Sequence, residues 1–125
     1  MLRGHHSVLL VDDELDIINT IRRWLQAYGF RVYAFADPLQ ALLYFQSNCD
    51  QIDLVLADIR MQKMNGYELV KKIKAIRPET KVIFMTALET DHQELSKELP
   101  TIRIDGFVSK PGSLEKLVSD IKKII

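Results

Sequence analysis

Five short apolar runs alternate with helical patterns along the chain, and this alternation restricts the fold more than any other feature. The runs are Ser7–Val11, Arg31–Phe35, residues 53–57, Lys81–Thr86 and residues 104–108. Several contain unbroken apolar stretches (VLL, LVL, VIFM), which are typical of strands buried on both faces. We therefore predict five strands with helices covering both sides of the sheet.

Between these runs, apolar residues recur at spacings of three and four, which predicts amphipathic helices. In the first helix, residues 14–28, the predicted buried face consists of Ile17, Ile18, Ile21, Leu25 and Tyr28. Asp37 before Pro38 predicts the N-cap and first turn of a second helix, and Ser113 predicts the cap of the last. Residues 66–76 form a third pattern. Residues 89–99 offer few large apolar side chains and predict a lightly anchored, mobile helix.

Alternating strands and helices with short connections favour parallel strands joined by right-handed crossovers. One doubly wound α/β domain over residues 7–125 accounts for the whole pattern. We expect residues 1–6 (MLRGHH) to be a short leader outside this domain.

The amino-acid composition argues against several classes of protein. The chain has 17 Lys plus Arg and 17 Asp plus Glu, so its formal net charge is zero and no basic excess favours nucleic-acid binding. The single cysteine, Cys49, cannot form an internal disulfide. No apolar run approaches the roughly 20 residues of a membrane span, and no signal-peptide pattern is present. We expect a cytoplasmic protein.

Polar residues follow four of the predicted strands. Asp12 and Asp13 follow the first, Asp58 follows the third, Thr86 ends the fourth and Lys110 follows the fifth. Ligands bind beyond the carboxyl ends of the strands in open α/β sheets. If the first and third strands are neighbours, three carboxylates converge and call for a cation. Lys110 or a hard divalent ion such as Mg²⁺ would supply that charge.

Each of these residues also has an ordinary structural explanation. Asp12 or Asp13 can cap the first helix, Thr86 can satisfy backbone groups at a strand end, and Lys110 can be a solvated loop lysine. The argument for a site is the coincidence of all of them at one edge of the sheet.

These residues occur in the motifs VLLVDDE, LVLADIRM, VIFMTA and GFVSKP, and with them the sequence resembles the CheY-like receiver domain of two-component response regulators. The resemblance covers residues 7–125. It implies a flavodoxin-like (βα)5 fold with a parallel five-stranded sheet in the order 2-1-3-4-5. It also implies a protein that promotes its own phosphorylation and dephosphorylation and is not a turnover enzyme.

The resemblance implies a phosphorylation site with a divalent cation. Asp58 would accept a phosphoryl group from a histidine kinase or histidine phosphotransfer protein. Mg²⁺, or Mn²⁺ in its place, would be bound by Asp13, by Asp58 and by the backbone carbonyl of Arg60, with Asp12 acting mostly through water.

The phosphoryl group would be held by further residues that the resemblance assigns. Thr86 and Lys110 would each contact a phosphoryl oxygen, and the backbone at Arg60 and Ala87 would contribute to the same site. The loop after Asp58 departs from the family pattern, because Gln62 and Lys63 replace its usual residues.

The resemblance also implies a switch. Thr86 would move towards the phosphoryl group, and Phe107 would turn inward to fill the space. The face formed by residues 89–99, the fifth strand and the last helix would then contact a downstream protein, an effector domain or a second copy of the chain. A permanently buried strand aromatic is the alternative for Phe107.

Three other functions fit the sequence less well. A haloacid-dehalogenase-type phosphatase would need a second Asp where the chain has Arg60. A flavin or nucleotide site would need a glycine-rich or hydroxyl-rich loop after the first strand, where VDDEL places carboxylates that repel phosphate. A degenerate receiver that only binds proteins would be expected to lack Asp58 or Lys110.

Overall fold

The sheet has five parallel strands, and its order agrees with the prediction. The computed structural model describes residues 6–86, 103–109 and 113–125. Its strands are β1 (Ser7–Val11), β2 (Arg31–Phe35), β3 (Leu54–Asp58), β4 (Lys81–Thr86) and β5 (Gly106–Ser109). They lie in the order β2-β1-β3-β4-β5, and every neighbouring pair is parallel. The flavodoxin-like α/β fold is therefore confirmed.

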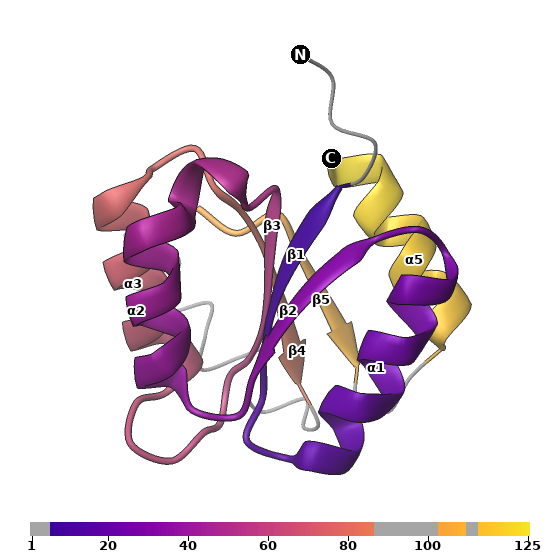
Figure 1. Ribbon diagram of the computed structural model, residues 1–125, viewed down its shortest axis with the longest axis horizontal. Coiled ribbons are helices and arrows are strands. Elements are labelled where there is room, and N and C mark those ends of the chain that lie inside the picture. The colour runs from indigo at the N-terminus through magenta and orange to yellow at the C-terminus, as the bar shows by residue number, and fades with distance from the viewer. Residues whose placement is uncertain (1–5, 87–102, 110–112) are drawn as a thin grey trace.

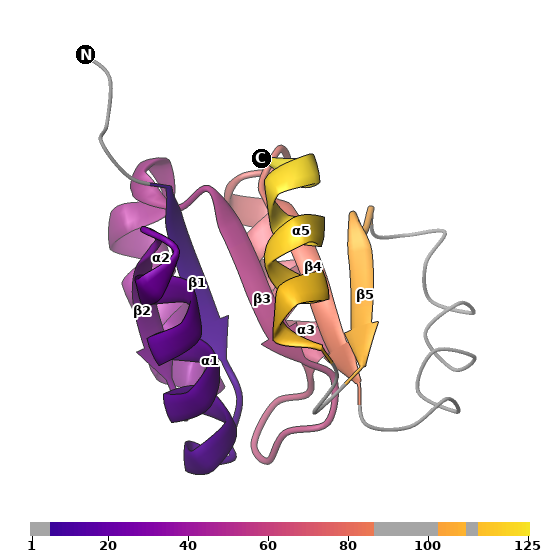
Figure 2. The same cartoon turned by 90° about the vertical axis from the view of Figure 1, so that its right-hand side faces the viewer.

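Helices cover both faces of this sheet (Figure 1). One face carries α1 (Leu15–Ala27) and α5 (Leu114–Ile124), and the other carries α2 (Pro38–Asn48) and α3 (Gly66–Ile76). A 3-10 turn, η1 (Cys49–Gln51), follows α2. Figure 2 shows the strands side by side with α5 in front of them. The predicted mobile helix at residues 89–99 lies outside the described residues.

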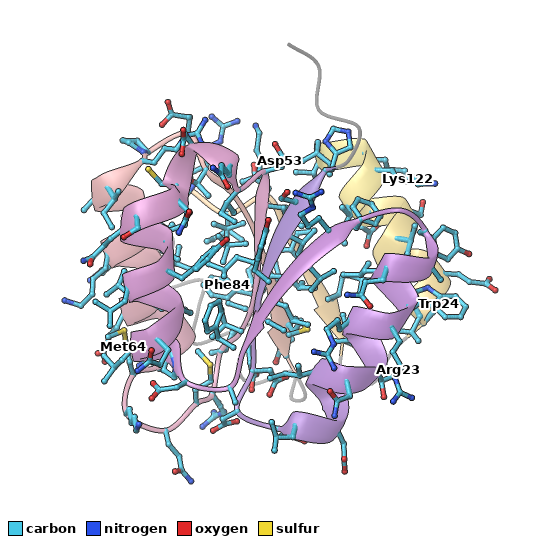
Figure 3. The ribbon with its side chains drawn as sticks, viewed as in Figure 1. Arg23, Trp24, Asp53, Met64, Phe84 and Lys122 are labelled. Carbon is cyan, nitrogen blue, oxygen red and sulfur yellow. The ribbon has the colours of Figure 1, made fainter. Side chains whose placement is uncertain are left out.

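Each face of the sheet has its own apolar core, because alternate strand residues point to opposite sides. Leu9, Val55 and Phe84 pack with α2 and α3, whereas Leu10, Leu56 and Ile83 pack with α1 and α5. Phe84 is fully buried between the sheet and the α2–α3 layer (Figure 3). This two-sided burial explains why the strands read as continuous apolar runs.

The bounds of two strands, β3 and β5, differ from the prediction. β3 includes Asp58 as its last residue, one position later than the predicted 53–57. β5 starts at Gly106 and not at residue 104. The physical reason for the second shift is Asp105, whose backbone N–H donates to the carbonyl of Val82 at 2.9 Å while its carboxylate accepts from the N–H of Val82 at 2.8 Å.

The predicted caps of α2 and α5 are present, whereas α1 follows Glu14 without a side-chain cap hydrogen bond, so neither Asp12 nor Asp13 is its N-cap. Asp37 accepts from the N–H of Leu39 at 2.9 Å, and Ser113 accepts from the N–H of Lys116 at 3.2 Å. On the predicted buried face of α1, Ile17 is half-buried and Tyr28 is exposed. Tyr28 is 45% exposed, because it follows the last turn of α1 as its C-cap, and its ring lies beside Trp24 with 5.6 Å between centroids. Among the helices that the structure describes, none is long and apolar enough to cross a bilayer.

Candidate functional site

The register of β1 and β3 brings two acidic residues to the same level at the carboxyl edge of the sheet. Val11 pairs with Ala57, so Asp12 comes directly after β1 where Asp58 ends β3. Asp12 is fully buried and Asp58 is 4% exposed. The pairing of β1 with β3 therefore brings these two carboxylates together, as predicted.

A third carboxylate completes the group. One carboxylate oxygen from each of Asp12, Glu14 and Asp58 lies within 4.8 Å of the other two. Glu14 is brought there by a tight turn, in which its backbone N–H donates to Oδ1 of Asp12 at 2.9 Å. This bond also gives Asp12 the turn-forming role that its position before α1 allows.

The three residues fit a hard divalent cation. Two negative charges 4.8 Å apart repel by about 3 kcal/mol at an effective dielectric constant of about 20. A bound cation would remove this repulsion between the carboxylates. All three donors are oxygens, as Mg²⁺ prefers, and exposed Glu14 leaves room for the waters that Mg²⁺ retains.

Asp13 lies outside this group. Its side chain is half-buried, and Oδ2 accepts a hydrogen bond from the backbone N–H of Gln62 at 3.1 Å. A hollow of about 420 Å³ lies beside it and is bordered by Arg60, Met61 and Gln62. The predicted metal ligand therefore faces the β3–α3 loop, and Arg60 is exposed in the same loop.

The β3–α3 loop is fixed tightly to the end of β3. The N–H of Ile59 donates to Met85 at 3.2 Å, and the N–H of Gly66 donates back to Ile59 at 2.8 Å. Gly66 lies so close to the strand that a Cβ there would overlap the carbonyl oxygen of Asp58. Glycine at position 66 thus allows α3 to begin directly against the strand that carries Asp58.

The other predicted residues lie on β4 and β5. Thr86 is buried at the end of β4, one residue after Met85, which pairs with Asp58. Phe107 is half-buried on β5 and pairs with Phe84, and the two ring centroids lie 6.1 Å apart. Phe84 and Thr86 are two positions apart on one strand, so Thr86 points to the same face of the sheet as the ring that lies beside Phe107.

Two predicted positions, Ala87 and Lys110, lie outside the described residues. Ser109, the residue before Lys110, pairs with Thr86, so β5 ends at the same edge of the sheet as β4. The roles of these positions remain predictions.

The structure adds two residues that were not predicted as part of the site. Glu14 joins the carboxylate group, and an Asp two positions before it is the sequence signal for the turn that brings it there. Gln62 stands out in the sequence only as a departure from the family loop. Its contact with Asp13 depends on a backbone N–H, which no side-chain motif reveals.

Comparisons with known proteins agree with this geometry. The sequence profile of the response regulator receiver domain matches residues 8–122. The chain is 31% identical over 124 residues to the sensor kinase CckA of Brucella abortus, covering 99% of this chain and 13% of that protein. It is 29% identical over 118 residues to the response regulator SaeR of Staphylococcus aureus, covering 94% of this chain and 50% of that protein. The chain thus spans half or less of the length of these curated relatives.

Two solved structures show the same architecture. A response regulator receiver domain protein from Clostridium thermocellum superposes with a TM-score of 0.86 at 27% identity, covering 96% of this chain and 94% of that chain. CheY in the CheX–CheY–BeF3–Mg complex of Borrelia burgdorferi superposes with a TM-score of 0.85 at 25% identity, covering 95% and 88%. Given the profile match, the sheet order and the acidic pocket, this chain belongs to the response regulator receiver domain family of two-component signalling, whose members are not turnover enzymes.

Proposed function

We propose that the chain is an active receiver in which Asp58 accepts a phosphoryl group. The observation that carries the proposal is the position of Asp58, a buried carboxylate that ends β3 within the group formed with Asp12 and Glu14. A carboxylate in a cation-compatible pocket is the nucleophile that this chemistry needs.

The proposed donor is a phosphohistidine on a histidine kinase or a histidine phosphotransfer protein. A carboxylate oxygen of Asp58 attacks phosphorus while the bond from phosphorus to the imidazole nitrogen breaks, and the electron pair of that bond returns to the ring. The product is an acyl phosphate on Asp58. Positioning and neutralisation of the phosphoryl oxygens account for most of the catalysis in such transfers.

Different residues of the pocket would bind the cation and the phosphoryl oxygens. When bound, Mg²⁺ supplies positive charge next to the phosphoryl oxygens. Asp58, with Asp12 and Glu14 beside it, would hold the cation, and Asp13 and the carbonyl of Arg60 are the ligands that the family pattern adds. Thr86, Lys110 and the backbone at Ala87 are proposed to hold the phosphoryl oxygens.

We further propose that phosphorylation is read out through Thr86 and Phe107. Phe84 connects them, since it shares a face of β4 with Thr86 two positions away and its ring centroid lies 6.1 Å from that of Phe107. A shift of Thr86 towards the phosphoryl group would therefore change the packing of Phe107. The changed face, which includes β5 and α5, would bind a downstream protein, an effector domain or a second copy of the chain, in the cytoplasm.

The test is the intact mass after incubation with Mg²⁺ and acetyl phosphate. We expect a gain of one phosphoryl group that is lost in Asp58→Asn and when EDTA removes the cation. Asp53→Asn is the matched control, because Asp53 precedes the same strand but lies at the opposite edge of the sheet (Figure 3), where it accepts from the N–H of Ser7 at 2.7 Å. No adduct on the unmodified chain, or an adduct that persists in Asp58→Asn, would contradict the proposal.

The switch is tested separately by NMR with beryllofluoride and Mg²⁺ as a phosphoryl mimic. We expect the signals of Thr86 and Phe107 to shift along with those of the pocket residues. If the shifts stop at the pocket residues, the proposed readout is wrong even where phosphorylation occurs.

A further inference from the structure

The β3–α3 loop contains a strained turn at Lys63. Its φ is 69°, the only positive φ at a non-glycine residue in the described part of the chain. The N–H of Met64 donates to the carbonyl of Gln62 at 2.7 Å, which closes a three-residue turn around Lys63. Turns of this shape with a positive central φ are rare and strained, and such strain persists only where surrounding contacts hold it.

One such contact is the side chain of Lys63 itself. Its Nζ lies 2.7 Å from Oδ2 of Asp37, and the other carboxylate oxygen of Asp37 accepts from the N–H of Leu39 at the start of α2. The hydrogen bond from Lys63, together with that from Leu39, lowers the pKa of Asp37 below its usual value. The ion pair therefore connects the strained turn to the N-terminus of α2.

The residue at the start of the turn also contacts the acidic residue before α1. The N–H of Gln62 donates to Oδ2 of Asp13 at 3.1 Å. Asp13 thereby faces the loop, outside the group of Asp12, Glu14 and Asp58. The loop is thus held by two acidic residues on different elements, Asp37 before α2 and Asp13 before α1.

We propose that Lys63 is a positioning residue: its ion pair with Asp37 holds the strained turn next to Gln62, whose N–H binds Asp13, so that the Asp13 side chain must turn away from this hydrogen bond to reach a cation held by Asp12, Glu14 and Asp58. The cation part of this inference rests on the proposed function, in which Asp13 is a cation ligand. Cation binding in the pocket would then break the hydrogen bond between Gln62 and Asp13. Loss of the ion pair between Lys63 and Asp37 would make cation binding more favourable.

The hydrogen bond is tested in metal-free protein, without reference to phosphorylation. In Lys63→Met, which keeps the strain and removes the charge, we expect the backbone amide of Gln62 to exchange with solvent about three- to tenfold faster by NMR. Lys63→Arg should retain the slow exchange of the unmodified chain. Lys63→Gly should also retain most of it, because glycine adopts a positive φ without strain.

A matched control keeps the comparison specific. Lys116→Met removes another exposed ion pair, between Lys116 and Asp120 on α5 at 3.9 Å, and should leave the exchange of Gln62 unchanged. If Lys63→Met leaves the exchange of Gln62 unchanged, or if Lys116→Met accelerates it equally, the ion pair does not hold the turn and the proposal is overturned.

The cation part is tested by calorimetric titration with Mg²⁺. Lys63→Met should bind Mg²⁺ about three- to tenfold more tightly than the unmodified chain, since the cation no longer competes with a hydrogen bond to a charged group. Lys63→Arg and Lys116→Met should bind with unchanged affinity. In the unmodified chain, saturating Mg²⁺ should accelerate the exchange of the Gln62 amide.

The outcomes separate the two proposals. Equal or weaker Mg²⁺ binding by Lys63→Met would overturn the competition while leaving the proposed function intact. Absence of Mg²⁺ binding by the unmodified chain would contradict the proposed function and the competition together, whereas the metal-free exchange data would still decide whether Lys63 holds the turn.

Discussion

Replacing Gly66 by Ala tests how closely α3 must approach the strand that carries Asp58. A Cβ at this position would overlap the carbonyl oxygen of Asp58 and lie 2.9 Å from Cα of Ile59. Both obstacles are backbone atoms, which cannot move aside as a flexible side chain would. The start of α3 must therefore shift away from β3.

The expected cost can be worked out from three contributions. Overpacking against a rigid neighbour typically costs about 1–3 kcal/mol. Weakening the hydrogen bond from Gly66 to Ile59, which is 2.8 Å long, adds about 1 kcal/mol. The higher helix propensity of Ala raises the free energy of unfolding by up to about 1 kcal/mol. We expect Gly66→Ala to lower the free energy of unfolding by about 2 kcal/mol.

Urea denaturation followed by circular dichroism measures this change, and Gly106→Ala is the matched control. A Cβ at Gly106 would meet Ile124 at 3.5 Å and Ile83 at 3.6 Å, both ordinary contacts with side chains. Gly106→Ala should therefore change stability by no more than about 1 kcal/mol in either direction. Equal effects of the two substitutions, or a stable Gly66→Ala, would refute the argument from close approach.

Three more predictions concern other parts of the fold. Phe45→Ala should lower the free energy of unfolding by about 3–5 kcal/mol in urea denaturation, because Phe45 is fully buried between α2 and the sheet; a loss below about 1 kcal/mol would contradict this. Gly29→Ala should cost about 1 kcal/mol by thermal denaturation, since φ is 90° there although no atom lies within 4 Å of the added Cβ; an unchanged melting temperature would argue against a left-handed conformation. The pKa of Asp37 is lowered from 3.8, so its stabilisation is present above that pH and is lost as the pH falls through the lower folded value. Asp37→Asn should therefore reduce the slope of stability against pH in this acid range, and an unchanged slope would show that Asp37 is not ionically paired.

Much of the fold is predictable because the apolar pattern and the short connections leave few alternatives. Alternating strands and helices predict parallel strands, and parallel strands place their carboxyl ends at one edge. That reasoning is enough to bring Asp12 and Asp58 to the same edge of the sheet. The exact neighbour order comes from the family resemblance, because the apolar pattern of the strands does not distinguish which of them are adjacent.

The remaining details depend on local backbone geometry that residue types do not encode. Glu14 joins the carboxylate group because a turn at Asp12 redirects the chain, while Asp13 faces the loop because it accepts from Gln62. Tyr28 continues the apolar spacing of α1 but is exposed at its C-cap, where Nζ of Lys122 lies 5.4 Å from its ring centroid. The strained turn at Lys63 has no sequence signal, since most positive φ values occur at glycine.

The central claim is that Asp58, and no other carboxylate of the acidic pocket, accepts the phosphoryl group. Borohydride reduction of the phosphorylated chain converts an acyl phosphate to an alcohol, so a modified aspartate appears as homoserine in peptide mass spectra. We predict homoserine at position 58 alone, and only after incubation with both Mg²⁺ and acetyl phosphate. A reduced side chain at position 12, 13 or 14, or the absence of homoserine from a chain that has gained a phosphoryl group, would contradict it.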